Sequence, residues 1–89
     1  MGSIKNLKKD INYVLGDIIE ECYNWELLNP KADDKEAESI INESIATFDS
    51  LIEKIHIKNV ENKKAHFKSI EMELETKANE LIEKVNKLY

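Results

Sequence analysis

Two histidines, one cysteine and many carboxylates are the side chains of this chain that could bind a metal or take part in catalysis. Glu53 and His56 form a Glu-x-x-His motif, the spacing with which helices hold metal in di-iron carboxylate bundles. Such a centre needs a second copy of the motif and two further glutamates. His66 is the only other histidine, and Lys63 stands where its glutamate would be. The ligand count therefore excludes a di-iron centre.

A zinc clip made by His56 and His66 is the remaining metal hypothesis, but two protein ligands are fewer than a zinc site normally uses. On a helical wheel Glu53 lies about 145° and His56 about 85° from the centre of their apolar stripe. Both side chains are thus expected outside the core. We favour two histidines at the boundary of the core, and we expect no metal and no other cofactor.

Nucleophilic and acid–base catalysis have little support. Cys22 lies in the middle of an apolar helical stripe, where a cysteine behaves as a small buried hydrophobe. The chain has no glycine-rich phosphate loop and no Ser/His/Asp spacing typical of a hydrolase. Carboxylates one turn apart, such as Asp17 and Glu21, are typical of a solvated helix surface. We therefore expect a protein that is not an enzyme.

These residues depend for their positions on three long amphipathic helices, which the spacing of the apolar residues predicts. We predict helices over about 4–28, 34–57 and 60–88, in a single domain over 1–89. The third stripe has gaps of three or four residues throughout, and the first two follow the same helical period, so the members of each stripe share one helix face. The first stripe is Ile4, Leu7, Ile11, Val14, Leu15, Ile18, Cys22 and Trp25. The second is Ala37, Ile40, Ile41, Ser44, Ile45, Phe48, Leu51, Ile52 and Ile55. The third is Phe67, Ile70, Leu74, Ala78, Leu81, Val85 and Leu88.

Capping and breaking residues set the predicted helix ends. Ser3 is a candidate N-cap of the first helix, and Pro30 ends that helix because proline cannot continue the hydrogen-bond ladder. Asp33 and Glu36 have the spacing of a capping box for the second helix. Asn59 is the predicted N-cap of the third helix, although no glycine or proline marks this break.

Together these features predict an all-α, up-down-up antiparallel three-helix bundle with long helices, short loops and coiled-coil-like spacing. Two glycines and one proline leave almost no material for β-hairpins. The alternative is one continuous helix over 34–88, roughly 80 Å long, which would have to dimerise to cover its stripe. We disfavour it because residues 57–59 interrupt the apolar spacing.

A second, partly apolar face lies on the back of the first predicted helix, about 120° to 160° from its core stripe. Its members are Tyr13, Gly16, Glu20, Tyr23 and Leu27. A three-helix bundle would leave this face in water, and Gly16 would let a partner backbone approach closely. Tyrosines suit an interface because they tolerate both burial and exposure. Isolated exposed tyrosines are also ordinary, so these residues make the face a candidate interface but do not by themselves identify one.

Charge is unevenly distributed along the predicted bundle. Residues 17–38 carry a net charge of −6, whereas residues 4–10 and 53–68 together carry +5. We call residues 4–10 and 53–68 the lysine-rich pole. Five of its lysines are candidate anion ligands: Lys5, Lys9, Lys58, Lys63 and Lys64. Solvated lysines at helix ends are the more ordinary interpretation, since lysine lacks the bidentate fork of arginine.

The composition limits the partners and the cellular location. A net charge of −5 over 89 residues disfavours nucleic acid and anionic membranes as partners of the whole surface. A single cysteine allows no internal disulfide, and the chain start lacks the apolar segment of a signal peptide. We therefore expect a cytoplasmic protein with no membrane span and no evident small-molecule substrate.

Three stretches of the chain carry a resemblance: residues 9–13 (KDINY), 29–31 (NPK) and 62–68 (NKKAHFK). Together they resemble a family of small, all-helical bacterial proteins of unassigned function. The resemblance covers nearly the whole chain and implies a stand-alone cytoplasmic bundle. It brings no substrate, cofactor or catalytic residue.

The sequence thus leads to two functional hypotheses. The first is a non-enzymatic interaction or scaffold bundle that binds a protein partner, most simply a second copy in a homodimer, through the back of the first helix. The alternative is a small anion or nucleic-acid binder that uses the lysine-rich pole.

Overall fold

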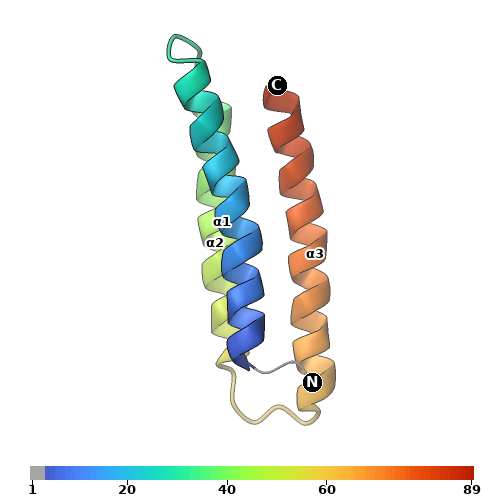
Figure 1. Ribbon diagram of the computed structural model, residues 1–89. Coiled ribbons are helices and arrows are strands. Elements are labelled where there is room, and N and C mark those ends of the chain that lie inside the picture. Colours follow the sequence, from blue (N-terminus) through green and yellow to red (C-terminus); the bar gives the residue numbers. More distant parts are fainter. Residues whose placement is uncertain (1–3) are drawn as a thin grey trace.

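The computed structural model describes residues 4–89, and this part of the chain is a bundle of three α-helices with no strand (Figure 1). The helices are α1 (Ile4–Leu28), α2 (Lys35–Ile55) and α3 (Lys63–Leu88). Each helix packs against both others, and they run alternately up, down and up (Figure 1). The predicted all-α three-helix bundle is confirmed. The continuous helix over 34–88 is wrong, because the chain leaves the helix after Ile55 and turns back. The candidate cap Ser3 lies outside the described residues.

The connection from α1 to α2 is closed by asparagine and aspartate side chains. Asn29 donates to the carbonyl oxygen of Trp25 from both its backbone amide, at 3.0 Å, and its side-chain Nδ2, at 2.9 Å. Asp33 Oδ1 accepts from the backbone amide of Lys35 at 3.0 Å. Asp34 occupies the N-cap position of α2 without a side-chain capping bond. The predicted Asp33–Glu36 capping box is therefore wrong, because the Asp33 carboxylate accepts its hydrogen bond from the backbone amide of Lys35 instead of that of Glu36.

The connection from α2 to α3 is longer than predicted. Asn59 has a φ of 63°, a left-handed conformation that asparagine tolerates but that an N-cap does not use. Asn62 is the N-cap instead, since its Oδ1 accepts from the backbone amide of Ala65 at 3.1 Å. The predicted start of the third helix at residue 60 is thus corrected to Lys63, and the predicted end of the second helix at residue 57 to Ile55.

The core follows the predicted stripes with three exceptions. Ile45 is 46% exposed because it lies about 100° from the middle of the buried residues of α2. Thr47 is buried on the other side of that face, where its hydroxyl donates to the carbonyl oxygen of Glu43 at 2.8 Å. Ile4 is 44% exposed, since it lies in the first turn of α1 at one end of the bundle.

The bundle is a rod of 51 × 19 × 17 Å. At the end that holds the C-terminus, Trp25 Nε1 donates to the carbonyl oxygen of Leu88 at 3.0 Å and so joins α1 to α3. Within the described residues, no helix combines the length and apolar character needed to cross a bilayer.

Candidate protein-interaction surface

The histidines of the Glu-x-x-His hypothesis lie at the end of the bundle that holds the α2–α3 connection. Glu53 and His56 are exposed, as the wheel predicts. His66 is half-buried, and its Nε2 donates to the carbonyl oxygen of Lys54 at 2.7 Å. Across residues 4–89, no three His, Cys, Asp or Glu side chains lie together in a way that could hold a metal ion. Through this hydrogen bond His66 joins the start of α3 to the last turn of α2.

Cys22 is fully buried in the core. Burial raises the pKa of its thiol, and the nearby carboxylates of Glu26, Glu21 and Glu38 raise it further. Both effects disfavour the thiolate, which is the nucleophilic form of cysteine. The prediction that Cys22 is a small buried hydrophobe is confirmed.

Glu26 and Glu38 bring two carboxyl groups together across α1 and α2. A side-chain contact with Glu38 raises the pKa of Glu26, and partial desolvation and the charges of Glu38 and Asp34 add to this effect. One oxygen of Glu26, Oε1, is buried without a hydrogen-bond partner. This pair makes the acidic end of the bundle sensitive to protonation.

The predicted back face of the first helix is exposed along its whole length, and we call it the outer surface of α1. Its members are Tyr13, Gly16, Glu20, Tyr23 and Leu27. Tyr13 is 74%, Tyr23 is 50% and Leu27 is 78% exposed. A Cβ atom placed on Gly16 would meet no atom within 4 Å. Tyr23 and Leu27 also line a shallow pocket against the α1–α2 connection.

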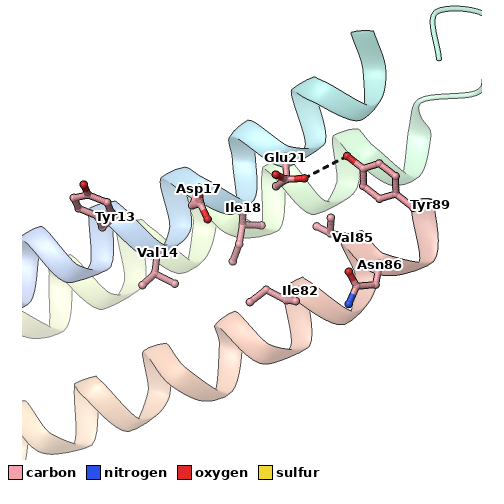
Figure 2. Close-up of a pocket in the computed structure, with 9 residues that line it drawn as sticks. All are labelled: Tyr13, Val14, Asp17, Ile18, Glu21, Ile82, Val85, Asn86 and Tyr89. Atoms are coloured by element: carbon pink, nitrogen blue, oxygen red, sulfur yellow. Dashed lines mark hydrogen bonds between the residues drawn. The ribbon is translucent and has the colours of Figure 1, made fainter. Parts of the chain in front are cut away.

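A groove runs between α1 and α3, and we call it the α1–α3 groove. One part, of about 560 Å³, is lined by Tyr13, Val14, Asp17, Ile18, Glu21, Ile82, Val85, Asn86 and Tyr89 (Figure 2). The adjoining part, of about 650 Å³, is lined by Leu7, Asp10, Tyr13, Val14, Glu71, Leu74, Glu75, Ala78 and Asn79. Tyr13 and Val14 belong to both parts, so the groove is continuous along the two helices.

The α1–α3 groove is closed at one end by Tyr89. Its hydroxyl donates to Glu21 Oε2 at 3.3 Å (Figure 2). Partial desolvation of the ring raises the pKa of Tyr89, and the Glu21 carboxylate raises it further. Tyr89 thus adds one exposed hydrogen bond between the end of α3 and α1.

Sequence reasoning identified Tyr13 but missed the rest of this groove. Ile82 lies one position outside the predicted core stripe and is 44% exposed, because it points into the groove (Figure 2). A signal existed in the acidic residues: Asp10, Asp17 and Glu21 recur on one flank of α1. That flank could be recognised as a groove only once the position of α3 was known.

The predicted anion-binding lysines gather at one end of the bundle. Lys5 and Lys9 lie in the first turns of α1, and Lys58, Lys63 and Lys64 in the α2–α3 connection and the start of α3. These segments lie at the same end (Figure 1). All five side chains are exposed, and none is in an ion pair with another described residue. The structure therefore brings together the lysines of the alternative hypothesis.

Comparison of the chain with protein-family models, with curated proteins and with solved structures finds no match.

Proposed function

We propose that this chain is a non-enzymatic interaction protein that forms a homodimer through the outer surface of α1. The observation that carries the proposal is the exposure of Tyr13, Tyr23 and Leu27 on one side of a single helix. Large exposed apolar side chains that are grouped on one face are typical of interaction sites, and tyrosine is enriched in protein interfaces. A cytoplasmic location is part of the proposal, supported by a single free cysteine.

Gly16 supports a close approach of two helices at this surface. Glycine in a helix interior costs about 1 kcal/mol relative to alanine, and nothing within the bundle requires the missing side chain. A partner helix can pack directly against the backbone there. In an antiparallel pair centred between Gly16 and Glu20, Tyr13 of one copy lies opposite Tyr23 of the other. Such a two-fold arrangement is self-complementary, as a homodimer requires.

Light scattering of a double variant tests the proposal. Tyr13→Glu with Tyr23→Glu adds two carboxylates to the interface and should convert the dimer to a monomer over a concentration series. The matched control is Ile57→Glu with Met72→Glu, which adds the same charge at two exposed apolar residues that do not belong to the outer surface of α1. We expect the control to keep the molar mass of the wild type. Dimers in all three proteins, or dissociation of the control alone, would show that the interface lies elsewhere.

The second candidate function is anion binding by the lysine-rich pole, favoured by the five exposed lysines at one end of the bundle. If it is correct, single-stranded DNA or RNA binds with an affinity that falls steeply between low and high salt. Reversing Lys58, Lys63 and Lys64 to glutamate should then abolish binding and leave the dimer unchanged. Absence of salt-dependent binding by the wild type would eliminate this candidate.

A further inference from the structure

The α1–α3 groove is a different surface from the outer surface of α1, and the two share only Tyr13. Its floor is apolar: Val14 and Ile18 point from α1 toward α3, and Ile82 points from α3 toward α1 (Figure 2). From Leu7 to Glu21 the groove spans 15 residues of α1, and the 14 steps between them are about 21 Å at the rise of an α-helix. These dimensions match one partner helix of about four turns laid along the groove.

The charges along the groove select the partner. Five carboxylates line its two parts, and no lysine does: Asp10, Asp17, Glu21, Glu71 and Glu75. In the described part of the chain no ion pair joins α1 to α3, whereas two join α2 to α3. Lys54 pairs with Glu73, and Lys84 pairs with Glu43 at 2.7 Å. The two lysines of these pairs, Lys54 and Lys84, line neither part of the groove.

We propose that the α1–α3 groove binds a basic amphipathic helix of a partner protein, which completes a four-helix bundle. The apolar stripe of that helix packs on the floor, and lysines or arginines on its two flanks pair with Asp17 and Glu21 on one side and Glu71 and Glu75 on the other. The homodimer through the outer surface of α1 leaves this groove unfilled, and the five carboxylates that line the groove favour a partner helix with positive flanks. The proposal goes beyond homodimerisation and names a second surface with its own partner chemistry.

Two synthetic peptides of the same length serve as probes. Both carry leucine at positions i, i+3, i+4, i+7, i+11 and i+14, so that each forms one apolar stripe over about four turns. The basic peptide has lysine at every flanking position, and the acidic peptide has glutamate there. Each carries a fluorescent label, and binding to the full chain is followed by fluorescence anisotropy at low and at high salt.

We expect the basic peptide to bind with a Kd on the order of micromolar and the acidic peptide at least about tenfold more weakly. Added salt should weaken binding of the basic peptide, because rim charges on a surface are screened. Ile82→Glu places a carboxylate on the floor of an acidic groove and should weaken binding at least about tenfold. Ile82 is already 44% exposed, so this variant is expected to keep the helical circular dichroism of the wild type.

A charge-matched pair of variants locates the site on the rim. Asp17→Asn with Glu75→Gln removes two carboxylates from the groove, whereas Asp49→Asn with Glu83→Gln removes two from exposed positions outside it. Only the first double variant should weaken the binding of the basic peptide and reduce the salt dependence of that binding. Equal loss with both pairs would show attraction to the overall charge and would overturn the proposal.

The remaining outcomes also decide the question. No binding of the basic peptide, or equal binding of the two peptides, overturns the proposal. A wild-type dimer that Ile82→Glu makes monomeric overturns it as well, because the occupant of the groove is then a second copy. Tyr23→Glu should leave peptide binding intact, since Tyr23 lines neither part of the groove. The experiments can therefore refute peptide binding in the groove and homodimerisation through α1 independently of each other.

Discussion

The paired carboxyl groups of Glu26 and Glu38 illustrate how single residues make the fold depend on pH. The contact with Glu38 raises the pKa of Glu26 above its ordinary value of 4.5. The folded chain therefore binds this proton more tightly than the unfolded chain does. It follows that the free energy of unfolding rises as pH falls from the raised native pKa toward 4.5, and that this contribution is lost as pH rises through the native pKa.

Glu26→Gln imitates the protonated state at every pH. We expect it to raise the unfolding midpoint in urea at pH 7, because it removes the repulsion from Glu38. The advantage over the wild type should shrink as the pH is lowered toward 4.5. Glu83→Gln is the charge control, since Glu83 is exposed on α3. An equal and pH-independent gain in both variants would show that only the net charge matters.

Residue-level prediction from sequence succeeded where one helix alone decides the environment. The burial of Cys22 follows from its position in the stripe of α1. The pairing of Glu26 with Glu38 could not be foreseen, because it depends on the register between α1 and α2. Ile45 shows the same limit: it lies at the border of its stripe, and the exact rotation of α2 decides that Thr47 is buried instead.

At the scale of the elements, the helix starts differ in how they are capped. The Asn62 side chain bonds to the backbone amide of Ala65 at 3.1 Å and fixes the start of α3. Asp34 makes no such bond at the start of α2. Sequence reasoning placed the caps at Asn59 and Asp33, because several Asn and Asp residues near each connection have suitable spacing. Which of these residues becomes the N-cap depends on how the next helix packs against the bundle.

Asn62→Ala should lower the free energy of unfolding by about 1 kcal/mol, the usual cost of losing a side-chain N-cap. Asp34→Ala should cost only a few tenths of a kcal/mol, since no capping bond is lost. Urea denaturation of both variants measures the difference. If Asp34→Ala proves as harmful as Asn62→Ala, the assignment of the caps is wrong.

Gly16 gives a prediction for α1. A Cβ atom at Gly16 would meet no atom of the bundle within 4 Å. Gly16→Ala should therefore stabilise the isolated bundle by about 1 kcal/mol. The comparison is made by urea denaturation at a concentration low enough to keep the protein monomeric. Destabilisation would mean that the backbone of α1 around Gly16 needs the freedom of glycine.

At the scale of the whole molecule, the sequence predicts the class of bundle but not its handedness. The stripes of the three helices require mutual packing, and this explains why the all-α bundle was predictable. They do not say on which side of the α1–α2 pair the third helix lies. That choice places α3 beside the acidic flank of α1 and so creates the α1–α3 groove.

The long, thin shape of the bundle gives it extended surfaces for partners. A rod of 51 × 19 × 17 Å has a narrow core and a large surface for its mass, so further burial by a partner stabilises it. The lysines at one end, the carboxylates of the groove and the apolar outer surface of α1 are separate regions on this rod. Each offers a different chemistry to a partner.

The molar mass of wild type and Gly16→Leu, measured by light scattering from about 10 µM to about 1 mM, tests the central claim most directly. The Gly16 position is open to solvent in the bundle, so leucine there should preserve the fold and block only the close approach of a second helix. The account predicts that the wild type reaches twice its 10.3 kDa mass while Gly16→Leu stays monomeric with unchanged helical circular dichroism. A wild type that stays monomeric throughout, or a dimer that tolerates leucine at this position, would contradict it.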